Sequence, residues 1–341
     1  MKTSGKNALP FALGALLLPA VMLLCVGVGS VSVPPGETAR ILLAALLGRE
    51  AEAGVFANIL LNVRLPRVIC VALSGAALSL CGAAMQGLLR NPLADGSTLG
   101  VSSGAALGAV LSLALGVALP GLPLSGATAM AMLFAFLSLM MILSLAYALD
   151  RSLETTSILL IGVIFSMFAS SVMTLVIAFS GDRVRSITFW TMGSFSGCSY
   201  AHAALLGAAL LLGGAAILRR SRELNAFAIG EDNARHVGVN VRRVKLEILV
   251  AVSAIIGVCV SVGGTIGFVG LVVPHMARMV VGPNHARLLP ASMLAGAVFL
   301  LLADLVGRTL LAPVELPIGV VTSMVGAVAF VVLFARTRKG R

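Results

Sequence analysis

Long stretches without an ionisable side chain are the feature that most constrains this 341-residue chain. Asp, Glu, Lys and Arg are absent from residues 7–36, 68–89, 96–149, 155–181, 186–218 and 316–335. A bilayer core about 30 Å thick requires roughly 20 apolar helical residues, so most of these stretches predict single membrane-spanning helices. Because 59% of the residues are hydrophobic and only 11% are charged, a soluble fold is excluded.

Two regions hold more than one span each. Residues 96–149 predict two helices joined by a turn at Pro120-Gly121-Leu122-Pro123. Residues 248–311 are interrupted by glycines and prolines, which predicts short helical pieces there. The apolar run at residues 8–28 predicts an uncleaved first span and not a signal peptide. The sequence therefore predicts an all-α polytopic membrane protein with eight clear spans and about ten in total.

The net charge of +11 is explained by topology. With ten spans and both termini in the cytoplasm, 17 of the 24 Lys and Arg residues fall on cytoplasmic segments. The other seven fall on outer segments: Arg40, Arg49, Arg64, Arg67, Arg183, Arg185 and Arg308. This bias follows the positive-inside rule. The basic excess thus indicates how the chain is oriented in the membrane, whose lipid surrounds it. No nucleic-acid partner is expected.

Ionisable residues inside the spans, which would mark an ion pathway, are nearly absent. Asp304 and Arg308, spaced i and i+4, are expected on one helix face near a membrane boundary, where they can pair. No span carries a central carboxylate, which disfavours an ion-coupled carrier, although a stand-alone secondary transporter of a small polar solute stays as the alternative. The chain has no phosphate-binding G-x-x-x-x-G-K-[ST] motif, and the cysteines and histidines lack metal-ligand spacing, so neither an enzyme nor a metal site is expected.

Two further patterns concern packing and docking. Small residues at four-residue spacing, Gly100, Gly104, Gly108, Ser112 and Gly116, predict a helix face that a neighbouring helix approaches closely. The longest polar interruption, residues 219–247, predicts a short helix over Ala226–Val237 with breaks at Gly230 and Gly238. On these residues alone, a solvated loop and a docking element for a cytoplasmic partner are equally good interpretations.

Several blocks, taken in order, make the chain recognisable. They are R-L-P-R at 64–67, S-G-A-A-L-S-L-C-G-A-A-M-Q-G-L-L-R-N-P-L-A-D-G-S-T-L-G-V-S-S-G-A at 74–105, G-E-D-N-A-R-H-V-G-V at 230–239, G-F-V-G-L-V-V-P-H-M-A-R at 267–278, A-D-L-V-G-R at 303–308 and E-L-P-I-G-V-V-T-S-M-V-G-A at 315–327. Together they resemble the FecCD-type iron-chelate and vitamin B12 uptake permeases, the transmembrane subunits of type II ATP-binding-cassette importers. The resemblance covers roughly residues 60–338.

The resemblance implies one ten-helix permease domain over residues 1–341, with a cytoplasmic coupling loop at 222–243. It implies a homodimer in a bacterial inner membrane, two cytoplasmic ATPase subunits and an extracytoplasmic substrate-binding protein. The cargo would be a ferric siderophore, haem or a corrinoid such as vitamin B12. ATP and Mg would bind the partner ATPase, and this chain would bind no cofactor and catalyse no reaction of its own.

The resemblance also assigns roles to single residues. Arg64, Arg67 and Arg308 match positions that meet acidic residues of the binding protein through exposed guanidinium groups, with anchoring at the membrane surface as the alternative. Thr156 and Ser157 match the cytoplasmic gate. They can also act as N-caps of the span that begins there. Gly230, Glu231, Ala234 and Gly238 match the helix that seats in the ATPase.

Three smaller expectations concern the block of the resemblance that begins at Ser74. Asn91 and Pro92 predict a turn that ends a span, and Gln86 is expected to pack between helices and not to line a cavity. Where the family commonly has an acidic residue followed by proline, this chain has Asp95-Gly96. We expect the glycine to loosen the start of the next span.

Overall fold

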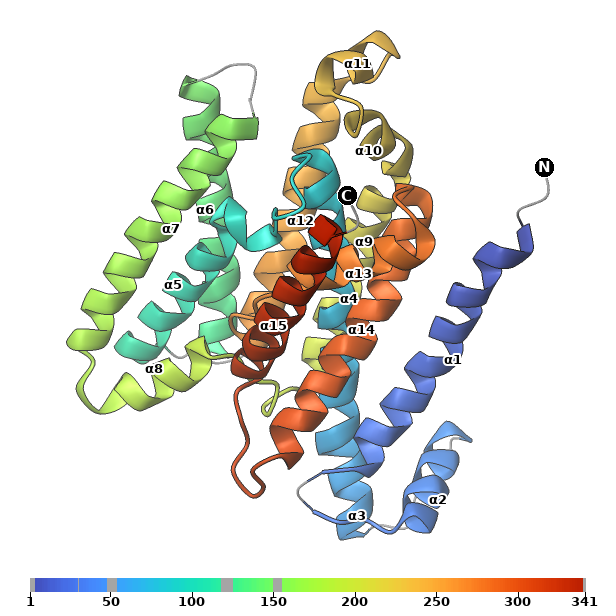
Figure 1. Ribbon diagram of the computed structural model, residues 1–341. Coiled ribbons are helices and arrows are strands. Elements are labelled where there is room, and N and C mark those ends of the chain that lie inside the picture. The colour runs from blue at the N-terminus through green and yellow to red at the C-terminus, as the bar shows by residue number, and fades with distance from the viewer. Residues whose placement is uncertain (1–3, 30, 48–53, 118–124, 150–154, 340–341) are drawn as a thin grey trace.

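The computed structural model describes residues 4–29, 31–47, 54–117, 125–149 and 155–339, and these ranges are all-helical (Figure 1). The chain begins with α1 (Ser4–Gly27), α2 (Pro35–Leu46) and α3 (Val55–Asn58), which continues through the π-helical turn η1 (Ile59–Arg64) into α4 (Leu65–Leu88). Next come η2 (Gly96–Leu99), α5 (Val101–Leu115), α6 (Gly126–Leu149), α7 (Thr155–Ala178), η3 (Gly181–Arg183), α8 (Val184–Thr191) and α9 (Tyr200–Arg219). The remaining elements are α10 (Ser221–Phe227), α11 (Glu231–His236), α12 (Val241–Gly263), α13 (Val269–Val281), α14 (His285–Thr309) and α15 (Ile318–Lys339).

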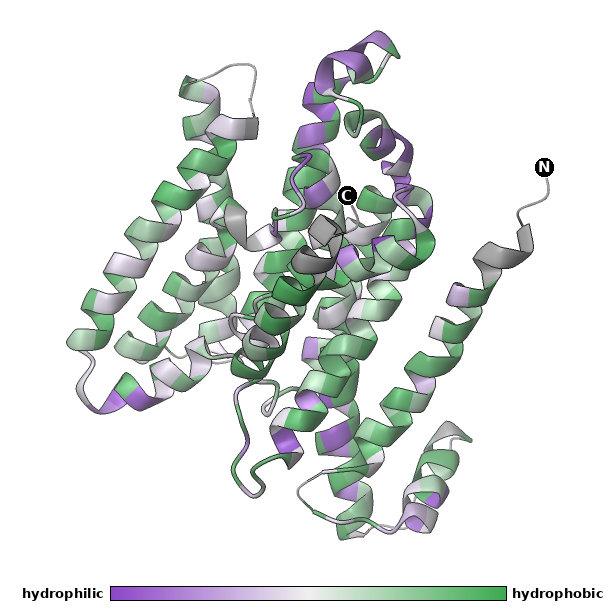
Figure 2. Cartoon of the chain, in the orientation of Figure 1, coloured by the Kyte–Doolittle hydropathy of each residue, from purple (hydrophilic) through white to green (hydrophobic). Residues whose placement is uncertain are grey.

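Seven segments of the described chain are long and apolar enough to cross a membrane: α1, the unit from α3 to α4, α6, α7, α9, α12 and α14. The shorter helices α5, α13 and α15 are also apolar. The predicted all-α membrane fold is confirmed: the described residues contain seven long spans, where the sequence predicts eight clear ones, and the three shorter helices bring the apolar elements to ten. Hydrophobic residues cover the helix shafts, and hydrophilic residues gather on α10, α11 and the adjoining end of α12 (Figure 2).

The two ends of the bundle carry different elements. The start of α1 and the end of α15 lie at the same end of the molecule as α11, and we call this the α11 end (Figure 1). The short helices α2, α3 and α8 lie at the opposite end, which we call the α2 end. The start of α1 and the end of α15 thus share one end of the bundle, as the ten-span arrangement with both termini on one side predicts.

Helix α4 lies at the centre of the bundle, in contact with α9, α12, α13 and α14. Two of its glycines permit this crowding. A Cβ atom on Gly75 would collide with the main-chain carbonyl of Gly296 in α14, and one on Gly82 would collide with that of Gly270 in α13. Glycine is thus needed where the helix backbones touch, because side-chain atoms would separate them.

The stripe of small residues lies along α5 and packs against α6, as predicted. A Cβ atom on Gly104 would collide with Ser138, and one on Gly108 would collide with the carbonyl of Met130. The outer two glycines end the helix: Gly100 at its N-cap has φ of 80° and Gly116 at its C-cap has φ of 68°. The predicted turn at 120–123 lies outside the described residues.

The interrupted region resolves into α12, the short α13 and the long α14. Gly264, with φ of 71°, ends α12, while Pro290 stays inside α14. Pro274 lies inside α13, and because proline has no N–H, the carbonyl of Gly270 loses its helical donor. Gln86 of α4 donates to that carbonyl at 3.3 Å and to the carbonyl of Leu271 at 3.1 Å. This confirms that Gln86 packs between helices.

One predicted helix differs from the structure. The sequence predicts one short helix over Ala226–Val237 with breaks at Gly230 and Gly238, but the structure has two helices here: α10 ends at Phe227 and α11 begins at Glu231. Gly230, with φ of 116°, separates the two helices. This left-handed backbone cannot continue a right-handed helix, so Gly230 breaks the segment as predicted and divides it into two helices.

Candidate functional site

An arginine cluster lies at the α2 end, formed by Arg64 at the end of η1, Arg67 in α4 and Arg308 in α14. Their exposed fractions are 5%, 9% and 3%. The expectation of exposed guanidinium groups is therefore wrong for this structure. All three groups are buried, and each has partners within the same chain.

Arg67 joins three segments of the chain. Its Nε and Nη2 donate to Asp304 Oδ1 of α14 at 3.1 and 2.9 Å. Its Nη1 contacts the carboxylate of Glu315, with distances of 3.1 Å to Oε1 and 2.9 Å to Oε2. Asp304 is 2% exposed, whereas the side chain of Glu315 is 36% exposed. The two edges of one guanidinium thus have a buried and a half-exposed carboxylate as partners.

Arg308 and Arg64 close the end of α1. Arg308 Nη2 donates to the carbonyl of Cys25 at 3.0 Å, and its Nη1 donates to that of Val28 at 3.3 Å. Arg64 Nη1 donates to the carbonyls of Val26 and Gly27 at 3.0 and 2.9 Å. The last carbonyls of a helix have no intrahelical partner and carry a partial negative charge, so two cations satisfy them here.

Asp304 and Arg308 pair as their spacing predicts, with Arg308 Nε 2.9 Å from Asp304 Oδ2. Asp304 therefore lies between Arg67 and Arg308 and offsets part of their charge. With Arg64 and Glu315 included, the arginine cluster contains three cations and two anions. Glu315 is absent from the predicted site, although it opens one of the blocks that carry the resemblance, because nothing in its sequence spacing relates it to Arg67.

The predicted coupling residues lie on and beside α11. Gly230 precedes this helix and Gly238 follows it, both with positive φ. Ala234 is fully buried, and Glu231 Oε1 lies 2.6 Å from Lys245 Nζ of α12. Glu231 and Ala234 thus face the rest of this chain, and they attach α11 to it. The exposed side chains of this segment are those of Asp232, Asn233, Arg235, His236 and Val237, which sequence reasoning did not select.

Thr156 and Ser157 lie in the first turn of α7, at the α11 end, with Thr156 exposed and Ser157 half-buried. Glu154, which precedes this turn, lies outside the described residues. Gating and helix capping by these hydroxyl groups both stay predictions.

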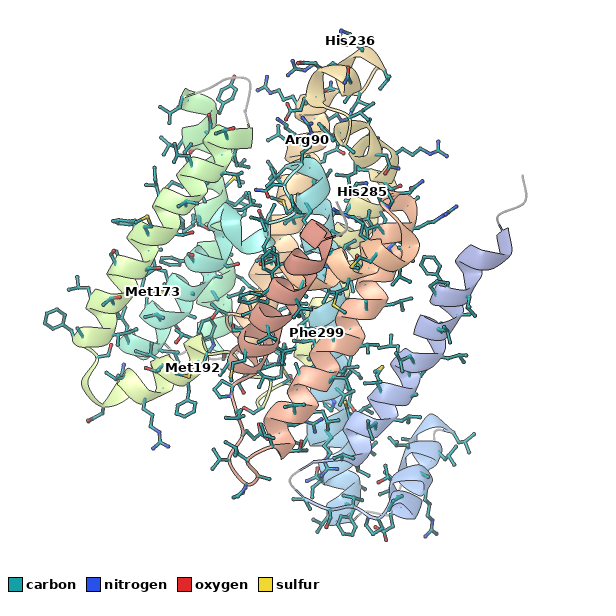
Figure 3. The ribbon with its side chains drawn as sticks, in the orientation of Figure 1. Arg90, Met173, Met192, His236, His285 and Phe299 are labelled. Carbon is teal, nitrogen blue, oxygen red and sulfur yellow. The ribbon has the colours of Figure 1, made fainter. Side chains whose placement is uncertain are left out.

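A cavity of about 640 Å³ lies between α5, α7, α12 and α15. Met173 of α7 and Met192, next to the end of α8, are two of its lining residues (Figure 3). Its lining has six hydroxyl side chains, three methionines and one carboxylate, those of Ser102, Ser103, Ser170, Thr191, Thr265, Ser323, Met173, Met192, Met324 and Asp95. No Lys, Arg or His is among the described lining residues. Such a volume is within the range of small-molecule sites.

The loop that ends in Asp95 follows a predicted turn. Asn91 Oδ1 accepts from the N–H of Leu93 at 2.9 Å, which confirms that Asn91 and Pro92 form the turn after α4. Gly96 does not act as expected: it is buried, and a Cβ atom there would collide with Ile256 of α12. The glycine permits close approach, and Asp95 thereby reaches the cavity wall.

The fold and these sites define the membrane-spanning subunit of a transporter. Over residues 17–336 the chain matches the FecCD transport family, and it belongs to that family. It is 40% identical over 332 residues to the uncharacterized ABC transporter permease YvrB of Bacillus subtilis, covering 97% of this chain and 94% of that protein. It is 39% identical over 288 residues to the hemin permease HmuU of Yersinia pestis, covering 83% and 85%.

A solved structure supports the same assignment. A metal-chelate type ABC transporter in an inward-facing conformation superimposes with a TM-score of 0.84 and 31% identity, covering 96% of this chain and 99% of that one. The substrates named for relatives vary: the molybdate permease MolB of Haemophilus influenzae is 34% identical, covering 95% of this chain and 94% of its own length.

The chain is therefore a multi-pass membrane protein and the permease subunit of an ABC importer. It is not itself an ATPase, and members of the family bind no cofactor of their own. An importer complex of this kind implies ATPase and binding-protein partners. The alternative of a stand-alone secondary transporter is replaced by this assignment.

Proposed function

We propose that two copies of this chain form the membrane pathway of a type II ABC importer for a bulky metal chelate, namely a ferric siderophore, haem or a corrinoid such as vitamin B12. The chain acts as one permease domain over residues 1–341. The α11 end faces the cytoplasm of a bacterial cell, where two ATPase subunits bind ATP and Mg. The α2 end faces outward across the inner membrane and receives a substrate-binding protein.

The composition of the cavity wall is the observation that carries the choice of cargo. A small oxyanion such as molybdate is held best by N–H donors and cationic side chains. The described cavity wall instead has the Asp95 carboxylate, hydroxyl groups and methionines. Methionine adapts to irregular apolar surfaces, and hydroxyl groups both donate and accept hydrogen bonds. This combination favours a large ligand with mixed apolar and polar surface.

Coupling to the ATPase falls to the α10–α11 region within residues 222–243. The exposed residues of α11 are the contact surface in this proposal, while Glu231, Ala234 and the two glycines fix its shape. The ion pair between Glu231 and Lys245 couples a movement of α11 to a movement of α12. Helix α12 carries Ile256 and Val260 of the cavity wall, so one rigid element connects the two sites.

The arginine cluster at the α2 end is the docking position for acidic residues of the binding protein. Its support is the excess of three arginines over two carboxylates, at a place where Glu315 is partly exposed. Thr156 and Ser157 of the two copies close the pathway at the α11 end, because small hydroxyl side chains can meet across a symmetry axis without a charge barrier.

ATP-dependent uptake into proteoliposomes tests the cargo. The complete importer is reconstituted into the proteoliposomes, and its binding protein is supplied with a ferric hydroxamate, haemin, cyanocobalamin or molybdate in turn. We expect uptake of one chelate and none of molybdate, and uptake of molybdate alone would overturn the proposal. Asp95→Asn should change the rate for the transported chelate, whereas Asp182→Asn, an exposed residue of η3 outside the cavity wall, should not.

A further inference from the structure

The Glu315 carboxylate occupies the edge of Arg67 that an incoming partner would need. Arg67 Nε and Nη2 are held by Asp304, which is 2% exposed. Only Nη1 points to a carboxylate that solvent reaches, since the side chain of Glu315 is 36% exposed. Arg64 and Arg308 donate to main-chain carbonyls at the end of α1 and are buried. Within the described cluster, Arg67 Nη1 is therefore the position at which one carboxylate can replace another.

Glu315 is also close in sequence to the cavity wall. It begins the segment that leads into α15, and Gly319 and Val320 of that segment line the cavity. The N–H of Leu316 donates to the carbonyl of Gly307 at 2.9 Å. The N–H groups of Ile318 and Gly319 donate to the carbonyls of Gly193 and Met192 at 3.2 and 3.1 Å. Met192 lines the cavity as well, so this segment connects Arg67 to the cavity wall.

We propose that docking proceeds by carboxylate exchange: an acidic side chain of the binding protein replaces Glu315 on Arg67 Nη1, and the released segment 315–320 shifts the Met192 side of the cavity wall. This inference rests on the proposed docking of a binding protein at the arginine cluster. It explains how the buried side chain of Arg67 serves as a docking position. The partner's carboxylate takes over an existing contact, so Arg67 is never left with an empty edge and Asp304 keeps its place.

The exchange makes a prediction opposite to that of a simple structural ion pair. If Glu315 competes with the partner, then removing its charge strengthens docking. Glu315→Gln keeps the shape of the side chain and removes the competitor. Glu315→Asp keeps the net charge but shortens the side chain by one methylene, which withdraws it from Arg67. Both variants should bind the binding protein more tightly than the parent.

The test measures the dissociation constant of the cognate binding protein from the complete importer in lipid nanodiscs. We expect it to fall about twofold to fivefold in Glu315→Gln, the range of a partly exposed ion pair. Asp182→Asn makes the same charge change at another exposed outer residue and should have a smaller effect. Thermal unfolding of each variant establishes that the fold is kept.

Failure of the inference and failure of the proposed function give different results. If the parent importer binds the binding protein but Glu315→Gln binds it equally or less tightly, carboxylate exchange is wrong while docking stands. If the parent importer does not bind it at all, the proposed docking is wrong and the exchange falls with it. The ATPase rate without binding protein tests the second step: we expect Glu315→Gln to raise it, and an unchanged rate would overturn the shift of segment 315–320.

Discussion

Lys245 of α12 places its ammonium nitrogen 2.6 Å from Glu231 Oε1, at the start of α11, although only 2% of the lysine side chain is exposed. A buried ammonium group is costly unless a carboxylate accompanies it. This contact therefore fixes the position of α11 relative to a long helix of the bundle. It gives Glu231 a role inside the chain, beside the coupling role that the resemblance assigns to it.

Replacing Glu231 should loosen this attachment. Glu231→Gln leaves the buried Lys245 ammonium without the carboxylate, and we expect a loss of about 1–3 kcal/mol in the free energy of unfolding. The ATPase of the importer complex should also respond less to the binding protein. Asp232→Asn is the control for unfolding alone, because the Asp232 side chain is 86% exposed and such pairs contribute little to stability. Equal effects of the two variants on unfolding would contradict the assignment.

The contact between α4 and α14 should not tolerate a side chain at Gly75. In Gly75→Ala, the new Cβ atom collides with the carbonyl of Gly296, so the helices must separate and we expect a loss of about 1–3 kcal/mol. Gly207→Ala in α9 is the matched helical control, since its Cβ atom would meet only Leu73 Cδ1 at 3.9 Å. Unfolding in detergent measures both, and the control should be neutral or slightly stabilised because alanine favours helix. A stable Gly75→Ala variant would show that the crossing can relax.

The end of α1 should depend on Arg308. Arg308→Gln removes the donors to the carbonyls of Cys25 and Val28 and the cation beside Asp304, and we expect a loss of about 2–3 kcal/mol. Hydrogen exchange at residues 21–27 should accelerate more than in the other spans. Arg185→Gln serves as the comparison, because Arg185 is exposed and lies 5.8 Å from the Phe189 ring. If the last turn of α1 stays as protected as in the parent chain, the carbonyls do not need Arg308.

The proposed gate can be tested by cross-linking. In a homodimer that closes at the α11 end, Thr156→Cys of one copy should form a disulfide with the same position of the other under mild oxidation. Thr174→Cys lies on the same helix near its opposite end and should not cross-link. The parent chain, with its five native cysteines, gives the background. Dimers of Thr174→Cys but not of Thr156→Cys would place the closure elsewhere.

Much of the site was accessible from sequence because membrane spans and short ordered blocks are local properties. Asn91 and Pro92 form the predicted turn, Gln86 packs as predicted, and Asp304 pairs with Arg308 because i and i+4 residues share a helix face. The exposure of Arg64, Arg67 and Arg308 was predicted wrongly. Burial depends on which distant segments cover a residue, and for Arg67 these are more than 200 positions away in the chain.

The sequence by itself determined the solvent in which this protein folds, the approximate number of its spans and the family to which it belongs. In a bilayer there is no water to pair with backbone N–H and C=O groups, so a long charge-free stretch pairs them internally by forming a helix. The tertiary structure alone decided that Glu315 contacts Arg67, that Lys245 supports α11 and that Asp95 lines a cavity of hydroxyl and methionine side chains. These relationships arise where helices from separate parts of the chain pack together, and no local spacing encodes them.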